Sequence, residues 1–423
     1  MILILMMLSL TMNSTASEDQ FCVYLDTNLV GRLHRRGDVT RFVFEKSYWL
    51  DPDRSVLGIR FEDNRNEVHQ SHLRIPSWFS NLLPEGRLRE WVAHARGTSV
   101  HREMELLAQV GHDLPGAVRI VQANSLVPIE TDDSIENPSI IMPDRSPWTF
   151  SLAGVGLKFS MLHAGDRLTL PATGEEGDWI VKLPDPNYQL TSVNEFMVMR
   201  LAGLSGIEVP EVKLIHRDQL SGLPDKVWTG SETWAYAVRR FDRLSDRSRV
   251  HIEDFAQVRG FPPESKYQGS YETVAALFYR RQDTEALREF SRRLVFNVIL
   301  GNGDAHLKNW SLIYRNKKIP TISPAYDLVS TFVYRPASEG PEKMALHLEK
   351  SRRIEKVSLK SFERLERRLN AKVGLGDVVR ETIRTICMNS VSLFDVPPGA
   401  EDLAGRINLY LSCQADRLLR LTV

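Results

Sequence analysis

Three side chains that could take part in phosphoryl transfer lie close together in the C-terminal half of the chain. Asp304 and Asn309 are five positions apart in GNGDAHLKN, and Asp327 follows eighteen positions later in SPAYDLVS. In protein kinases an Asp accepts the hydroxyl proton, while an Asn five residues later and a second Asp downstream hold Mg²⁺, which prefers oxygen ligands. The spacing therefore predicts Asp304 as catalytic base, and Asn309 and Asp327 as metal ligands.

A plainer interpretation exists for each of these residues alone. GNGD is a common way to end a helix, and an Asp such as Asp327 often occupies a turn or a cap. The set is better explained together, because it lies between two apolar runs and after a strand-rich half of the chain. A short polar loop between buried segments can hold catalytic groups rigidly.

Two more residues of this loop could act in the chemistry. His306 could bind a metal, but Mg²⁺ prefers oxygen, so we expect His306 to orient the loop by hydrogen bonds. Lys308 either meets the transferring phosphate as a point charge or is an ordinary solvated lysine. Both interpretations of Lys308 fit the sequence.

A kinase also needs a lysine on the nucleotide phosphates. DWIVKLP predicts a strand carrying Lys182, which either contacts these phosphates or extends from an edge strand into solvent. On the following helix, predicted over 192–206, Glu195 either pairs with Lys182 or completes a capping box with Ser192. SLAGVGLKFS, residues 151–160, could bring backbone N–H groups near phosphates, although a G-x-G pair alone is weak evidence.

The elements that position these residues fall into three regions. Alternation and turn signals predict short strands within 21–62, in the runs 21–33 and 40–50, two helices over 80–97 and 99–111, and a strand over 116–121. Further strands are predicted within 148–162, as a hairpin around Gly154 and Gly156, and within 178–184, 209–215 and 233–243. Helical spacing predicts helices within 271–280, 283–302, 358–374 and 403–421. A strand-rich lobe before a helical lobe suggests a ligand cleft between them.

The domain boundaries follow from composition. Residues 122–147 hold four prolines among Asp, Asn and Ser, which indicates a linker. We therefore expect four segments: 1–20 as a disordered or mis-assigned start, 21–122 as a small N-terminal subdomain, 123–147 as the linker, and 148–423 as a two-lobed domain. Its lobes would cover about 148–250 and 251–423. The apolar start MILILMMLSLTM favours an over-extended start site over a signal peptide, because no Lys or Arg precedes it.

The composition excludes several classes of protein. Lys plus Arg equals Asp plus Glu, 54 each, so a strongly basic nucleic-acid binder is not indicated. The three cysteines are far apart and form no CxxC, which argues against zinc or a disulfide framework and suits a cytoplasmic protein. No segment reaches the roughly 18 apolar residues of a membrane span.

The chain resembles the HipA-type serine/threonine kinases, toxins of bacterial toxin–antitoxin pairs. GDAHLKN with PAYDLVS is the most specific signature, and SLAGVGLKFSML is similar to the family's phosphate loop. Further segments match the family pattern: IVKLP, the NE of Asn194–Glu195, RRFDR, EDFAQ, KYQ and MALHLEKSRR. NLLPEGRLRE and LLAQVGHDLPGAVRI resemble the first subdomain, so the resemblance covers nearly the whole chain from about residue 21.

This resemblance implies an α+β, two-lobed kinase-like fold with an added small N-terminal α/β subdomain, and ATP and Mg²⁺ as cofactors. It implies that Asp304 and Lys182 are catalytic and that Asn309 and Asp327 hold Mg²⁺. The implied nucleotide contacts are Ala153, Gly154, Lys158, Lys182, Val238, Arg240, Phe241, His306, Lys308 and Asn309. Adenine would be held through backbone groups of the hinge, and Ser151 falls where relatives carry an autophosphorylated serine.

Relatives phosphorylate an aminoacyl-tRNA synthetase and bind a small helix-turn-helix antitoxin, so DNA would be contacted only through that partner. Two departures from the family pattern stand out. Gly156-Leu157 replaces a common Gln-Glu in the phosphate loop, and Arg239-Arg240 replaces an acidic residue of the hinge. An active kinase is the leading hypothesis. The alternatives are an inactive pseudokinase that serves as a binding module for the repressor, and a small-molecule kinase.

Overall fold

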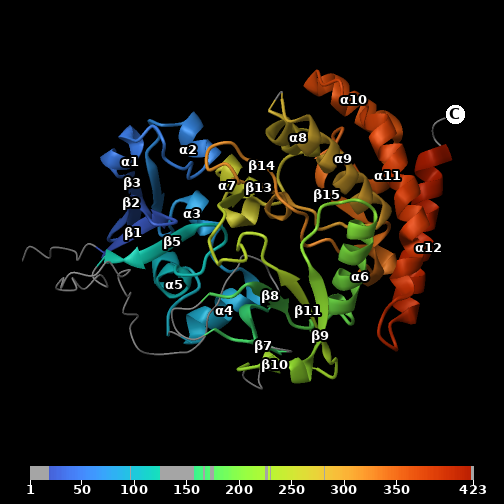
Figure 1. The fold of residues 1–423 in the computed structure, drawn as a ribbon, viewed down its shortest axis with the longest axis horizontal. Helices are drawn as coiled ribbons and strands as arrows, with labels where there is room; N and C mark the ends of the chain where they lie inside the picture. Colours follow the sequence, from blue (N-terminus) through green and yellow to red (C-terminus); the bar gives the residue numbers. More distant parts are fainter. Residues whose placement is uncertain are drawn as a thin grey trace, which may run out of the picture.

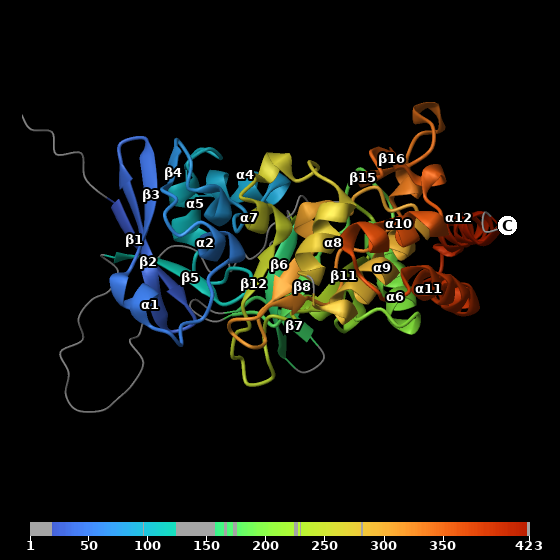
Figure 2. The same cartoon turned by 90° about the horizontal axis from the view of Figure 1, so that it is seen from above.

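The computed structural model describes residues 19–95, 97–123, 157–164, 167–171, 176–223, 227–228, 230–280 and 282–420. Along its longest axis the chain runs from the N-terminal sheet at one end, through a second sheet, to a group of helices at the other end (Figure 1). The view from above shows the same order, with the N-terminal strands and the last helices at opposite ends (Figure 2).

The N-terminal subdomain is a five-stranded antiparallel sheet, in the order β4-β3-β2-β1-β5, covered by short helices. Its strands are β1 (Asp19–Leu25), β2 (Asn28–Arg36), β3 (Val39–Phe44), β4 (His69–His72) and β5 (Val118–Gln122). Its helices are α1 (Lys46–Leu50), α2 (Ile59–Asp63), α3 (Ser77–Ser80), α4 (Gly86–Ala95) and α5 (Glu103–Val110).

One strand prediction in this subdomain is wrong at its end. The run 40–50 was expected to be a single strand, but β3 ends at Phe44 and α1 follows. Phe44, paired with Gly31, is the last residue of β3 in the ladder. The next residue, Glu45, still donates its N–H to the carbonyl of Val30, and the chain then turns into α1. From the helix, Tyr48 stacks on Phe44 with ring centroids 5.7 Å apart. The aromatic residues suit a strand, but here they fill the core from a helical turn.

Gly111, just after α5, is expected to tolerate no side chain. A Cβ there would meet the carbonyl oxygen of Ile120 in β5 at 2.2 Å. We expect Gly111→Ala to lower the free energy of unfolding by about 1–3 kcal/mol through overpacking, measured by urea denaturation. Gly405→Ala is the matched control, because nothing lies within 4 Å of its added Cβ. An Ala there should stabilise α12 (Glu401–Arg420) by about 0.5–1 kcal/mol, and equal effects at both sites would contradict the packing argument.

The second sheet has six strands in the order β10-β7-β6-β8-β11-β9, and only the β10–β7 pair is parallel. Its strands are β6 (Lys158–Ala164), β7 (Arg167–Thr169), β8 (Trp179–Lys182), β9 (Val212–His216), β10 (Leu220–Ser221) and β11 (Trp234–Arg239). Helix α6 (Thr191–Leu204) packs against β9 and β11.

The sheet separates two hydrophobic cores, because successive side chains of a strand point to opposite faces. In β11, Ala235 and Ala237 belong to the core shared with the N-terminal subdomain. Tyr236 and Val238, between and after them, belong to the core of the helical lobe. The N-terminal subdomain therefore buries its apolar surface directly on one face of this sheet.

The helical lobe follows residue 250. Its helices are α7 (Phe255–Arg259), α8 (Tyr271–Tyr279), α9 (Thr284–Ile299), α10 (Leu359–Leu369), α11 (Leu375–Asn389) and α12. The lobe also contains two small sheets. One consists of β12 (Ile252–Asp254), β13 (Ser311–Ile313) and β14 (Thr321–Ile322), and the other is the hairpin of β15 (Lys343–Leu348) with β16 (Ser351–Arg353). Helix α11 was not predicted from the sequence. None of the helices in the described part of the chain is long and apolar enough to cross a membrane.

Candidate active site

A cleft of about 370 Å³ lies where the N-terminal subdomain, the six-stranded sheet and the helical lobe meet. Its walls bring together predicted site residues that are far apart in the sequence: Lys158, Lys182, Val238, Arg240, Phe241, Asp304, His306, Lys308, Asn309 and Asp327. The predicted Ser151, Ala153 and Gly154 lie outside the described residues. Residues from the N-terminal subdomain also line the cleft, among them Asn81 and Glu85.

The loop after α9 carries Asp304 into this cleft. The chain leaves α9 through Gly301, which has a left-handed φ of 61° and would clash with Tyr410 and Phe332 if it carried a side chain. Asn302 then accepts the N–H of Asp304 at 2.9 Å. Asn309 donates its side-chain N–H to the carbonyl of Asp304 at 2.8 Å. The five-residue spacing thus closes the loop on itself and fixes Asp304 relative to Asn309.

Tyr267 contacts the carboxylate of Asp304, which the sequence analysis did not anticipate. Its phenol donates to Asp304 Oδ1 at 2.5 Å, although the ring is 40% exposed. Partial burial, followed by the nearby charge of Asp304, raises the pKa of Tyr267, so the phenol stays protonated and donating. The only sequence signal was KYQ, which matched the family pattern without a role.

The expectation that His306 orients the loop by side-chain hydrogen bonds is wrong. Within the described residues its Nδ1 has no hydrogen-bond partner, and the ring is 5% exposed. The imidazole packs edge-on against Tyr267, with centroids 5.0 Å apart. Burial lowers the pKa of His306 to about 4, so the ring is neutral at physiological pH. Packing replaces hydrogen bonding because the loop already satisfies its own polar groups through Asn302 and Asn309.

Lys182 joins two carboxylates from different elements. Lys182 lies on β8, and its Nζ is 2.5 Å from Oε1 of Glu195 on α6. The same ammonium also donates to the carboxylate of Asp327. Burial, with Asp327 adding to it, raises the pKa of Glu195 to about 7. Burial would also raise the pKa of Asp327, but Lys182 and Lys158 outweigh it and hold that pKa below its usual range. Two carboxylates therefore compete for one ammonium.

The structure decides between the two interpretations of Glu195. Helix α6 begins after Leu190, so Ser192 lies inside the first turn and makes no cap. The Ser192 hydroxyl is buried without a partner among the described residues. Glu195 pairs with Lys182 instead, and Lys182 is not a lysine extended into solvent.

Lys158 and Asp327 complete this charged end of the cleft. Lys158 on β6 lies directly opposite Lys182 on β8 in the antiparallel register. Burial lowers the pKa of Lys158 to about 8, and the neighbouring charge of Lys182 acts in the same direction. Asp327 has a left-handed φ of 55°, an uncommon conformation for a residue other than glycine. Such strained backbone is concentrated at functional sites.

The Lys308 ammonium is buried and already has partners in the N-terminal subdomain. Its Nζ lies 2.5 Å from Oε1 of Glu85 and donates to the carbonyl of Asn81 at 2.9 Å. Lys266 binds the other oxygen of Glu85 at 2.8 Å. The solvated alternative is therefore wrong, because an acidic residue of the N-terminal subdomain receives this lysine.

The hinge segment 238–241 lines the cleft, and two of its backbone N–H groups are already hydrogen-bonded. The N–H groups of Arg239 and Arg240 donate to the carbonyls of Glu211 and Asp178 at 2.9 and 2.8 Å. Hinge contacts to an adenine would therefore use carbonyl groups or the N–H of Phe241.

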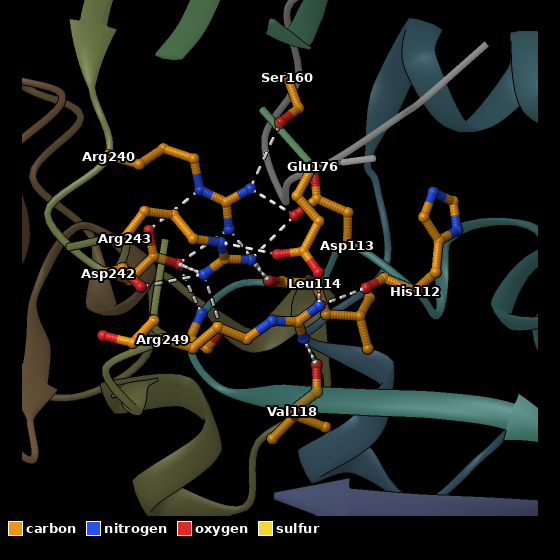
Figure 3. Close-up of polar contacts among 12 residues, drawn as sticks. His112, Asp113, Leu114, Val118, Ser160, Glu176, Arg240, Asp242, Arg243 and Arg249 are labelled. Atoms are coloured by element: carbon orange, nitrogen blue, oxygen red, sulfur yellow. Dashed lines mark hydrogen bonds and ion pairs between the residues drawn. The ribbon is translucent and has the colours of Figure 1, made fainter. Parts of the chain in front are cut away.

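The Arg240 guanidinium lies in a buried ion cluster instead of facing a nucleotide (Figure 3). The cluster joins three arginines and three carboxylates: Arg240, Arg243, Arg249, Asp113, Glu176 and Asp242. Asp113, from the N-terminal subdomain, is fully buried and lies 2.5 Å from Arg240 and 2.9 Å from Arg243. Gly116 donates its N–H to Asp242 at 2.7 Å. Arg240 thus ties the hinge to the N-terminal subdomain.

Metal binding by this site would need ligands beyond the protein. In the described parts of the chain, no group of three or more His, Cys, Asp and Glu side chains could hold a metal ion. Asn309 and Asp327 nevertheless both line the same cleft, and each carries a side-chain oxygen. This donor set suits Mg²⁺, which keeps several waters and is commonly bound by one or two side chains plus phosphate oxygens.

Two family models match the chain: the HipA N-terminal domain over residues 21–121, and the HipA-like C-terminal domain over residues 150–393. The Sinorhizobium fredii protein named "Putative kinase Y4dM" is 40% identical over 81% of this chain and 84% of its own. The Shewanella oneidensis protein named "Serine/threonine-protein kinase toxin HipA" is 28% identical over 62% of this chain and 64% of its own.

A solved structure shows the same fold. It is titled as a Shewanella oneidensis toxin–antitoxin complex of HipA, HipB and operator DNA. Its matched chain has a TM-score of 0.72 and 22% identity, with 95% of this chain and 97% of that chain covered. The predicted α+β architecture is therefore confirmed.

Proposed function

The chain belongs to the HipA family, and on that premise we propose that it is an ATP-dependent serine/threonine protein kinase. One observation carries the proposal: a single cleft gathers Asp304, Asn309, Asp327 and the Lys182–Glu195 ion pair from four separate parts of the chain. These are the groups that phosphoryl transfer needs for proton acceptance, metal binding and phosphate positioning. An inactive binding module would have no need to keep them together.

In this proposal Asp304 accepts the proton of the acceptor hydroxyl. Its Oδ1 is already bonded to Tyr267, so Oδ2 is the atom that would face the acceptor. Lys182, held by Glu195, would contact the nucleotide phosphates, and Lys158 beside it would add a second positive charge. Ser192 lines the same cleft, and its buried hydroxyl, which has no hydrogen-bond partner among the described residues, could bond a bound group.

Asn309 and Asp327 would hold Mg²⁺. The ion supplies neutralisation of phosphate charge and alignment of the transferred group. Lys182 contacts Oδ1 of Asp327, which leaves Oδ2 as the oxygen that would bind the metal.

The partners we propose follow the family. The solved relative is titled as a complex of HipA, HipB and operator DNA, and we propose that this chain likewise pairs with a small helix-turn-helix antitoxin. An aminoacyl-tRNA synthetase is the protein target we propose, with inhibition of translation as the result. Ser151 would be a site of autophosphorylation.

The proposal is tested by incubating the purified full chain with ATP and Mg²⁺, alone and with a panel of purified aminoacyl-tRNA synthetases. Mass spectrometry should find phosphate on Ser151 and on one synthetase, and on neither with Asp304→Asn. A folded wild-type chain that binds ATP but transfers phosphate neither to itself nor to any synthetase would count against the proposed activity. A phosphate that appears equally with Asp304→Asn would remove Asp304 from its role.

A further inference from the structure

Glu85 is an acidic residue of the N-terminal subdomain that reaches the catalytic loop of the helical lobe. It precedes α4, lines the cleft, and uses each carboxylate oxygen for a different lysine. Oε1 lies 2.5 Å from Lys308 Nζ, and Oε2 lies 2.8 Å from Lys266 Nζ. The side chains of both lysines are less than 10% exposed, at 5% and 9%. Glu85 is thus the counter-charge of two buried cations.

Each of these lysines immediately precedes a residue that contacts Asp304. Lys266 precedes Tyr267, whose phenol bonds the Asp304 carboxylate at 2.5 Å. Lys308 precedes Asn309, whose amide bonds the Asp304 carbonyl at 2.8 Å. The two segments are also joined directly, because Leu307 donates its N–H to the carbonyl of Lys266 at 3.0 Å. Movement of either lysine would therefore shift a neighbour that holds Asp304.

The electrostatics favour a permanently charged Glu85. Burial acts to raise its pKa, but Lys308 and Lys266 outweigh burial and lower the pKa to about 2. Without this carboxylate, Lys308 would keep its hydrogen bond to the neutral carbonyl of Asn81 and the nearby charge of Asp254, while Lys266 would lose the ion pair that holds it. A buried charge that loses its partner is costly, so the lysines would move toward solvent or toward Asp304.

We propose that Glu85 is a positioning residue for phosphoryl transfer, through which the N-terminal subdomain sets the placement of Asp304 and Asn309. The inference rests on the proposed kinase activity. It gives the N-terminal subdomain a share in the chemistry, because the loop that carries Asp304 is fixed by a residue of another domain. Glu85 acts through Lys266–Tyr267 and Lys308–Asn309 and does not itself touch the reacting atoms.

The test compares Glu85→Gln with Glu264→Gln in the full chain. Glu264 pairs with Arg74 across the same boundary, at 2.5 Å, but both side chains are well exposed. For Glu85→Gln we expect kcat to fall about 10- to 100-fold, with KM for ATP within about twofold, because a small displacement of a catalytic group is costly to the rate. Hydrogen–deuterium exchange of peptides covering 302–310 and 266–268 should rise without ligand. Glu264→Gln should alter neither kcat nor exchange in these peptides.

Unchanged kcat and unchanged exchange in a folded Glu85→Gln chain would overturn the proposal. Should Glu85→Gln fail to fold, Lys266→Met carries the test, because it frees Tyr267 while Glu85 keeps Lys308. A smaller fall in kcat and faster exchange in the same peptides are then expected, and wild-type values in both would again overturn the proposal. A wild-type chain that transfers no phosphate would refute the kinase activity alone, since the exchange comparison still reports whether Glu85 fixes the loop.

Discussion

Replacing Asp304 by Asn is expected to slow phosphoryl transfer by about 10²- to 10⁴-fold, the usual contribution of a positioned general base. Asn has nearly the same shape but cannot accept the acceptor hydroxyl's proton. The loop should keep its form, because Asn309 bonds the backbone carbonyl of Asp304 and not its carboxylate. Nucleotide affinity should therefore stay within about twofold. Initial-rate kinetics and calorimetric titration with ATP measure the two quantities separately.

Asp246→Asn provides the matched control for this substitution. The control substitution also replaces a carboxylate by an amide, but on an exposed turn, where the Asp246 carboxylate accepts hydrogen bonds from Ser248. It should leave both rate and affinity unchanged. If Asp304→Asn kept more than a tenth of the wild-type rate with unchanged affinity, Asp304 would not be the proton acceptor. A loss of ATP affinity equal to the loss of rate would indicate a binding role instead.

Replacing Asp113 by Asn is expected to lower the free energy of unfolding by about 3–5 kcal/mol, the usual cost of removing one partner from a buried ion pair. Asp113 is fully buried and contacts both Arg240 and Arg243. The cluster holds three positive and three negative side chains, so the substitution leaves one buried positive charge uncompensated. Urea denaturation followed by circular dichroism measures the change in free energy.

Asp395→Asn is the comparison for Asp113→Asn. Asp395 also pairs with an arginine, Arg200, but its side chain is 70% exposed. Exposed pairs contribute about 0–1 kcal/mol, so this substitution should be nearly neutral. A cost below about 1 kcal/mol for Asp113→Asn would mean that the remaining carboxylates, or water that enters the cluster, can compensate the arginines without Asp113.

The division into a strand-rich and a helical lobe could be predicted from periodicity because the buried faces are regular. Alternate residues of β11 face different cores, and α9 carries apolar residues at helical spacing. The end of β3 could not be predicted, since the aromatic residues of 40–50 suit a strand and a buried turn equally well. What decided it was the partner strand, where the pairing with β3 stops at Gly31.

Within the site, residues whose chemistry and spacing lie in one short stretch were predicted together, and the structure places them in one cleft. The five-residue spacing predicted that Asp304 and Asn309 belong to one site, and the structure joins them by a hydrogen bond. Glu85 was missed because its partner Lys266 is 181 positions away, and no local pattern links them. The side-chain role of Arg240 was also beyond the sequence, because only the fold brings Asp113 beside it.

Glu85 and Asp113 also limit how this protein could be recombined with its relatives. Consider a hybrid that joins the N-terminal subdomain of one chain to the catalytic domain of another. In it, the acidic residue and the basic residues of each ion pair would come from different proteins. It would need an acid to meet Lys266 and Lys308, and another to meet Arg240 and Arg243. The two domains thus form one heritable unit, in which a change on one side of the boundary calls for a matching change on the other.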